Sequence, residues 1–311
     1  MNVISITKLN TRIAAGYRNS LFELYRFLFA MWIVWYHGYF IFKNQYFDDG
    51  YIAVEFFFLL SGFYYLKTLD KYKDKKFFEG IFQIIISKVK SFGFAFVVGL
   101  LFVAWQRILE EKPVLLGYLW YIPIMLLAFA LIYLMKRLIK RESIFIISLI
   151  GVVIINYLIL YVPIIEKFGV SRGLGAVSLG VLISYLPKIE IKISKLSLNL
   201  ILTISVLCSV IYLAYLPKNG LMYEHLLIFV CMPMLIYFTN TLKINSKVLN
   251  FFGSLSFALY SYQCVVRVLR MIFTMPQYVY FVILICLVAL DRIINTMVKN
   301  HFQNRKMKIG T

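Results

Sequence analysis

Ionisable side chains lie inside otherwise apolar stretches of this 311-residue chain. The first stretch contains Glu23, Arg26 and His37, and the next contains Glu55. A charged side chain at the centre of a bilayer costs about 3 kcal/mol on insertion, so ionisable residues in such stretches are functional candidates. An imidazole can take a proton near neutral pH, a carboxylate can orient it, and a guanidinium can bind an anion. These residue types together could perform proton transfer beside an anionic substrate.

Arg26 and His37 share one face of the helix expected in the first stretch. They are eleven positions apart, which at about 100° per residue leaves them roughly 20° apart around the helix and about 16 Å apart along it. Glu23 lies one turn before Arg26 on the same face. Two plainer interpretations stay open: Glu23 and Arg26 pair at the membrane edge, and His37 is a hydrogen-bonded structural residue.

Glu55 precedes the run FFFLL, whose apolar residues roughly offset the cost of inserting the carboxylate. Such a helix inserts only if Glu55 faces protein or water. The short connection 43–49 makes the first two helices neighbours, so Glu55 could orient His37. The competing interpretation pairs Glu55 with Arg172 or Lys88, which would hold the helices together.

The composition identifies the elements that must position these residues. Hydrophobic residues make up 62% of the chain and charged residues 15%, whereas a soluble globular chain has about 45–50% and about 25%. The surface of a soluble protein cannot absorb this excess. The composition therefore excludes a cytosolic enzyme, a disordered chain and a disulfide-stapled secreted domain, and it indicates an integral membrane protein.

The apolar stretches have about the length that a helix needs to cross a bilayer. We expect an all-α, polytopic transmembrane bundle with about ten spans, at 21–42, 50–66, 81–104, 117–135, 143–162, 171–186, 198–216, 222–241, 249–269 and 278–298. The sequence predicts one ten-helix domain at 21–298, between short basic tails at 1–20 and 299–311 that suit anionic membrane lipid. For Ser61-Gly62 we expect close contact with another helix or a kink.

Lysine and arginine residues favour one orientation of the bundle. With both termini in the cytoplasm, the cytoplasmic segments hold about three times as many Lys and Arg residues as the outer segments. The same rule explains the net charge of +19 without nucleic acid as a partner. The four cysteines lie in apolar runs without CxxC spacing, so we expect neither a metal site nor disulfides.

Five runs of the sequence carry a resemblance to a known family. They are RNSLFELYRFLFAMWIVWYH at 18–37, VEFFFLLSGF at 54–63, LWYIPIMLLAF at 119–129, RGLGAVSLGVLISY at 172–185 and FFGSLSFALYSYQ at 251–263. In the order and spacing of these runs, the chain resembles the membrane acyltransferase-3 family. The first two runs match specifically and the later three more loosely, and together they span nearly the whole chain.

The resemblance implies an enzyme of the bacterial inner membrane with ten helices. Such enzymes transfer an acyl group, usually acetyl from acetyl-CoA, to an extracytoplasmic hydroxyl of a cell-surface glycan or lipid-linked sugar. The family's essential histidine falls on His37, its arginine on Arg26 and its acidic position on Glu55. This chain departs from the family where many members carry a late histidine, because it has Gln263 there.

Acyl transfer to a hydroxyl requires a base that takes the hydroxyl proton as the thioester carbonyl is attacked. We expect His37 to be that base and Glu55 to orient it, and no metal is required. The cations expected to bind the phosphates of acyl-CoA are Arg26, Lys88 and Lys90. The two lysines stand where the family often has an arginine cluster, and they bind phosphate as point charges. Arg172 fits either a contact with the donor or the pairing with Glu55.

Two other classes of function compete with acyl transfer. A transporter or lipid flippase could use the same buried charges as a substrate path, although matching broken helices in two halves are not evident in the sequence. A structural partner in a glycan-assembly complex would not need His37. Replacement of His37 separates an enzyme, which loses product, from a scaffold, which does not.

Overall fold

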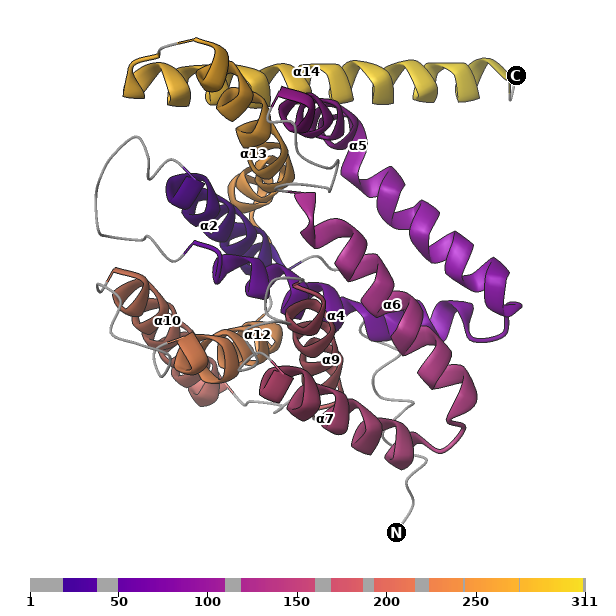
Figure 1. Ribbon diagram of the computed structural model, residues 1–311. Coiled ribbons are helices and arrows are strands. Elements are labelled where there is room, and N and C mark those ends of the chain that lie inside the picture. The colour runs from indigo at the N-terminus through magenta and orange to yellow at the C-terminus, as the bar shows by residue number, and fades with distance from the viewer. Residues whose placement is uncertain are drawn as a thin grey trace.

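The computed structural model describes residues 19–37, 50–109, 119–159, 169–186, 193–215, 224–242, 244–273 and 275–309. Every regular element in these ranges is helical, which confirms the predicted all-α class. The helices are α2 (Ser20–His37), α4 (Ala53–Tyr72), α5 (Phe77–Leu109), α6 (Tyr121–Leu138), α7 (Glu142–Ile159), α9 (Val170–Tyr185), α10 (Ile193–Tyr215), the π-helical turn η2 (Leu226–Cys231), α12 (Met232–Thr241), α13 (Lys247–Ile272) and α14 (Gln277–Ile309) (Figure 1). Each predicted span except the eighth falls on a single helix. The eighth falls on η2 and α12, which follow one another without a gap.

Two of the described helices are long and apolar enough to cross a bilayer by themselves, Tyr121–Leu138 and Tyr278–Val298. The two halves of α5 make a third if they form one broken span. The ten crossings therefore stay a prediction. Most of the predicted N-terminal tail lies outside the described residues, and the predicted C-terminal tail continues α14 as far as Ile309.

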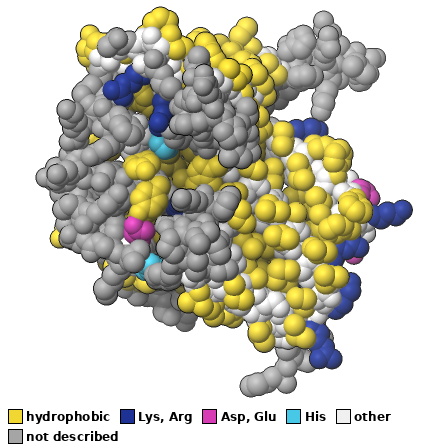
Figure 2. Space-filling model, viewed as in Figure 1, with side chains coloured by type: hydrophobic (Ala, Val, Ile, Leu, Met, Phe, Trp, Pro, Cys, Tyr) yellow, Lys and Arg dark blue, Asp and Glu magenta, His cyan; other side chains and the backbone are white. Residues whose placement is uncertain are grey.

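Apolar side chains cover most of the described surface seen in Figure 2, and charged side chains gather along one edge. Near the ends of α4, α6, α7 and α9, Arg137 donates a hydrogen bond to the carbonyl of Lys75, and Glu142 accepts from both Lys136 and Tyr185. These bonds join four helix ends that the sequence assigns to the same side of the membrane. Their meeting agrees with the predicted alternation of the spans, and the side that faces the cytoplasm stays a prediction.

Cysteine labelling tests this orientation. In a variant whose four native cysteines are replaced by serine, we expect Lys73→Cys and Leu138→Cys to resist a membrane-impermeant maleimide in intact cells. Both should react after permeabilisation, because the positively charged ends of the helices stay in the cytoplasm. Lys167→Cys, on a predicted outer connection, serves as the control that reacts in intact cells. Labelling at position 73 or 138 from outside would reject the orientation.

Helix α4 packs closely against α9, and glycine makes this contact possible on both helices. A Cβ atom at Gly62 would overlap the carbonyl oxygen of Val177, and a Cβ at Gly180 would overlap that of Leu59. Small residues let backbones approach in this way in membrane bundles. The expected role of Gly62 in close helix contact is therefore confirmed.

Helices α2 and α13 lie side by side and run in the same direction. Their first turns are joined where the Ser20 N–H donates to the carbonyl of Ile244 at 2.8 Å. One turn further along, Gly253 leaves room for the side chain of Glu23, because any Cβ there would overlap it. At the far end of α2, His37 and Arg267 lie within electrostatic range. Residues on α2 therefore lie beside residues about 230 positions later on α13.

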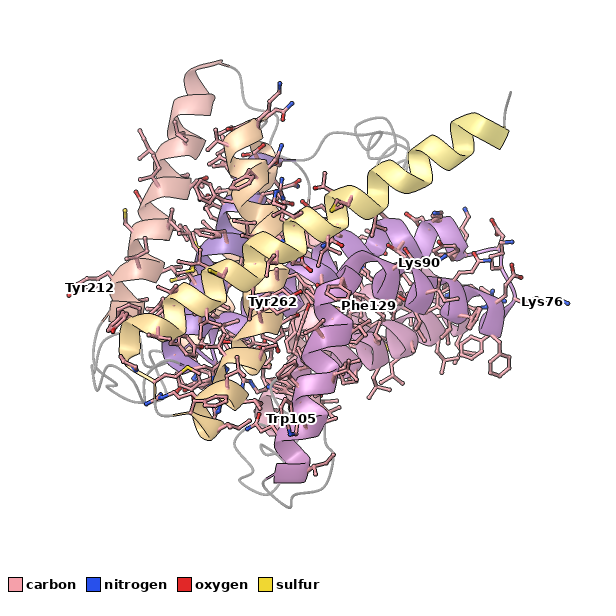
Figure 3. The ribbon with its side chains drawn as sticks, turned by 90° about the horizontal axis from the view of Figure 1, so that it is seen from above. Lys76, Lys90, Trp105, Phe129, Tyr212 and Tyr262 are labelled. Atoms are coloured by element: carbon pink, nitrogen blue, oxygen red, sulfur yellow. The ribbon has the colours of Figure 1, made fainter. Side chains whose placement is uncertain are left out.

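Helix α5 is broken at Gly93, whose φ of +65° suits glycine. The two halves, Phe77–Lys90 and Phe92–Gln106, are bent by 85°, and Figure 3 shows one half extending from Lys76 and the other toward Trp105. The break frees the N–H of Ala95, and the carboxylate of Asp291 on α14 accepts a hydrogen bond from it. Asp291 also accepts from Tyr262 at 3.0 Å. A side chain from the last helix thus caps the second half of α5.

Candidate active site

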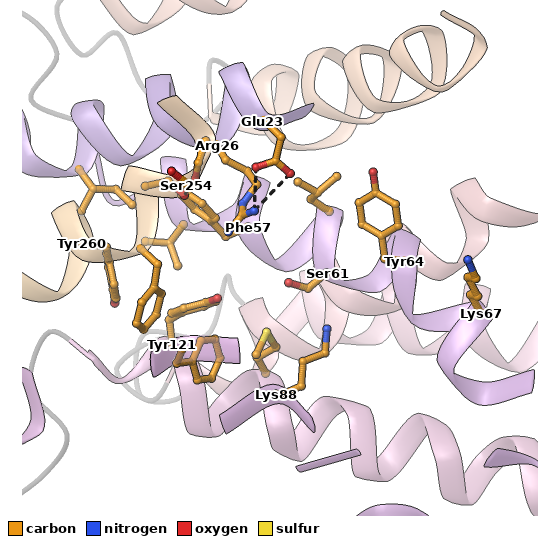
Figure 4. Close-up of a pocket in the computed structure, with 18 residues that line it drawn as sticks. Glu23, Arg26, Phe57, Ser61, Tyr64, Lys67, Lys88, Tyr121, Ser254 and Tyr260 are labelled. Carbon is orange, nitrogen blue, oxygen red and sulfur yellow. Dashed lines mark hydrogen bonds and ion pairs between the residues drawn. The ribbon is translucent and has the colours of Figure 1, made fainter. Parts of the chain in front are cut away.

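A cavity of about 750 Å³ lies among α2, α4, α5, α6 and α13. Its charged lining residues are three cations and one carboxylate, Arg26, Lys67, Lys88 and Glu23. Arg26 and Lys88 extend into it from opposite sides (Figure 4). A cleft with this excess of positive charge and apolar walls favours an anionic ligand. Its volume is within the range of small-molecule sites.

Arg26 is held by Glu23, one turn earlier on α2. Its Nη1 lies 3.1 Å from one carboxylate oxygen of Glu23 and 3.3 Å from the other. The Glu23 side chain is 7% exposed and that of Arg26 is 32% exposed. The structure shows the pairing of these two residues that the sequence left open, and the pair positions the guanidinium at the cavity.

Lys88 approaches the cavity from the first half of α5, just before the break. Its ammonium lies 5.3 Å from the ring centroid of Phe129, within the range of a cation–π contact. Lys88 also lies within electrostatic range of Arg26. Lys90, two positions later, is exposed and is not among the lining residues. Of the three cations expected to bind the donor, the structure brings together Arg26 and Lys88.

Aromatic rings form the less polar part of the cavity wall. Tyr121 and Tyr260 meet edge to face with their centroids 5.6 Å apart, and Phe92 stacks on Phe257 at 4.7 Å. Phe57 lies against Tyr121 with a centroid separation of 6.4 Å. Such a wall suits an uncharged chain better than a charged group.

Glu55 and Arg172 form a buried ion pair between α4 and α9. Arg172 Nε donates to Glu55 Oε1 at 2.6 Å, and Arg172 Nη2 donates to the carbonyl of Tyr51 at 3.1 Å. The Glu55 side chain is fully buried, and the guanidinium of Arg172 also lies 5.8 Å from the ring of Trp120. Of the partners considered for Glu55, the structure shows Arg172. The second carboxylate oxygen of Glu55 has no hydrogen-bond partner in the described ranges.

His37 is the last residue of α2 and is half-buried. Ile33, one turn before it, lines the cavity together with Arg26. Since these three residues share one face of the helix, His37 stands next along the cavity face, about 16 Å from Arg26 along the axis. The residues of α2 that line the cavity and the predicted base therefore lie on one face of this helix, although His37 is not itself among the lining residues.

Several lining residues were not singled out by sequence reasoning. Lys67 was assigned to a cytoplasmic connection, because α4 was expected to end at residue 66, whereas it continues to Tyr72. Ser61, Tyr64 and Lys67 recur at intervals of three, which places them on one helix face and was the available signal. In the described part of the chain, no group of three His, Cys, Asp or Glu residues is arranged to hold a metal ion.

Comparison with known proteins identifies the family. A family model described as an acyltransferase domain matches residues 19–290, which is most of the chain. No curated protein and no solved structure matches the chain. The matched region contains all six site residues predicted from the sequence, as well as every helix that lines the cavity. The chain belongs to the acyltransferase-3 family of membrane acyltransferases.

Proposed function

We propose that the protein transfers an acetyl group from cytoplasmic acetyl-CoA to a hydroxyl of an extracytoplasmic glycan or lipid-linked sugar, in a bacterial inner membrane. The cavity carries this proposal, because it combines a cationic part at Arg26, Lys67 and Lys88 with an aromatic wall. Acyl-CoA has the matching chemistry: phosphates at one end and a long uncharged arm that leads to the thioester. Cations and phosphates form strong charge-assisted hydrogen bonds.

The face of α2 supports the same assignment. Arg26 lines the cavity and His37 lies on that face about 16 Å further along, a distance comparable to an extended pantetheine arm. Phosphates bound at Arg26 would therefore place the thioester near His37. The donor would enter from the cytoplasmic side, and the acceptor would approach the other end of α2 from outside.

The reaction then needs one base at the thioester. Neutral His37 takes the proton of the acceptor hydroxyl as its oxygen attacks the thioester carbonyl. The new C–O ester bond forms and the C–S bond breaks, so that CoA leaves as a thiolate. The imidazolium returns its proton to this thiolate, and His37 is neutral again for the next turnover.

The position of Glu55 changes what we expect of it. Its Oε1 is hydrogen-bonded to Arg172, and the pair joins α4 to α9. We therefore propose that Glu55 maintains the packing of these two helices, on which Val54, Phe57 and the other cavity residues of α4 depend.

A transporter is the second candidate, because one observation favours it. The break in α5 lies beside the cavity, because Lys88 in the first half and Phe92 at the start of the second half both line it. Broken helices that line a substrate site are common in transporters. Uptake or flipping without acetyl transfer, unchanged by loss of His37, would select this candidate over the enzyme.

Arg26 variants test the donor. We expect Arg26→Ala to raise the KM for acetyl-CoA by about 10- to 100-fold in inverted membrane vesicles, because charge-assisted hydrogen bonds to the phosphates are lost. Arg26→Lys should lose less, since a point charge remains. The penalty should disappear with acetyl-pantetheine, which has no nucleotide phosphates. Arg141→Ala, an exposed arginine remote from the cavity, is the control. An equal penalty with both donors would reject phosphate binding by Arg26.

A further inference from the structure

The side chain of Gln263 on α13 is buried, with an exposed fraction of 2%. Among the described residues, neither its amide oxygen nor its amide nitrogen has a hydrogen-bond partner. An unpaired carboxamide in an apolar environment costs free energy, so a buried amide with no partner at either atom calls for an explanation.

The position of Gln263 relates it to the cavity. Ser256 and Tyr260 line the cavity, and Gln263 follows them at intervals of four and three residues. At about 100° per residue, the three side chains and Arg267 fall within an arc of roughly 60° on α13. Arg267 in turn lies within electrostatic range of His37. Gln263 therefore stands between the cavity and the predicted base.

Because α2 and α13 pack in parallel, the position of Gln263 along the axis of α2, between Arg26 and His37, can be derived. Since Glu23 lies beside Gly253, Gln263 stands at the level of Ile33, which also lines the cavity. At 1.5 Å per residue it is about 10 Å beyond the level of Arg26 and about 6 Å before that of His37. A donor arm that runs from Arg26 to His37 would pass this side chain.

We propose that the carboxamide of Gln263 binds an amide group in the arm of the acyl donor. The inference rests on the proposed function. A carboxamide donates and accepts, as does the secondary amide of a pantetheine arm, so the amide N–H or the amide C=O of the arm can pair with the matching orphaned atom of Gln263. A phosphate offers acceptors alone and would leave the amide oxygen unpaired. The first amide of pantetheine is two carbon atoms from the sulfur, which suits a contact just before His37.

Gln263→Met tests this assignment, because methionine keeps the length and volume of the side chain and removes the amide. We expect the KM for acetyl-CoA and for acetyl-pantetheine to rise about 2- to 10-fold, as expected for one lost neutral hydrogen bond. The KM for S-propyl thioacetate, which has no amide, should not change. Thermal stability in detergent should be equal or higher, because no bond in the unliganded protein is lost.

Thr203→Val on α10 is the matched control, since its hydroxyl is also buried and has no partner in the part of the chain that the structure describes. It should leave the KM of all three donors unchanged. An equal loss with all three donors in Gln263→Met, a change in the acceptor KM alone, or no change at all would overturn the inference. A wild-type protein that transfers acetyl from neither acetyl-CoA nor acetyl-pantetheine would overturn the proposed function and this inference together. An active wild type with an unaffected Gln263→Met would overturn the inference alone.

Discussion

Replacing His37 with alanine is expected to abolish acetyl transfer while the amount of folded protein stays near that of the wild type. A general base contributes about 10²- to 10⁴-fold to the rate, so the rate of acetyl transfer should fall by at least about 10²-fold. His37 is the last residue of the described helix α2 and is half-buried. Transfer from labelled acetyl-CoA to the acceptor in native membranes, normalised to folded protein, measures the effect.

His225→Ala is the matched control. His225 is half-buried and its ring stacks on Phe229 at a centroid distance of 5.7 Å, so both variants remove a partly buried imidazole. We expect this control to retain activity. Normal specific activity in His37→Ala would reject the base, and a matching loss of folded protein would instead identify His37 as a structural residue.

The second large effect is expected at the ion pair between α4 and α9. Glu55→Gln leaves the charge of Arg172 buried without a counter-ion, which typically costs about 3–5 kcal/mol. We therefore expect a large fall in the melting temperature and in the amount of folded protein in the membrane. Activity per folded molecule should stay near that of the wild type. Combining Glu55→Gln with Arg172→Gln should be less harmful than the sum of the single changes, because the two residues interact.

An exposed pair provides the comparison for this experiment. Glu142 pairs with Lys136 while its own side chain is 52% exposed, so Glu142→Gln should cost less than about 1 kcal/mol. If Glu55→Gln folds normally and loses its specific activity, Glu55 acts beside His37, as the sequence first suggested. Thermal melting and transfer measured on the same samples distinguish the two results.

The sequence predicted the helices well and their contacts less well. The length of the apolar stretches located every described helix, because a helix pairs its own backbone polar groups and is the form that an apolar stretch of this length favours. Helical periodicity also placed Glu23 beside Arg26, since that pair lies within one turn. The partner of Glu55 could not be derived in this way. It depends on how closely α4 and α9 approach, and that approach depends on Gly62 and Gly180 together.

The break in α5 was also not predicted. Gly93 lies inside one predicted span without a proline, and glycine alone does not break a helix. Beside the bend, Asp291, almost two hundred residues later, accepts a hydrogen bond from the N–H of Ala95, a contact that the sequence does not reveal. Gln263 was noted for its difference from the family, but its unpaired amide was recognisable only once its neighbours on α2 and α13 were placed.

The contact between Asp291 and α5 bears on how far the protein can be shortened at its C-terminal end. The match to the family stops at residue 290, one position before Asp291. A protein shortened to that boundary would keep every residue that lines the cavity and lose the acceptor of the Ala95 N–H. A contact at the bend of α5 is therefore made by a side chain outside the region by which the family is recognised. Any excised or chimeric version of the enzyme must therefore retain α14 past Asp291.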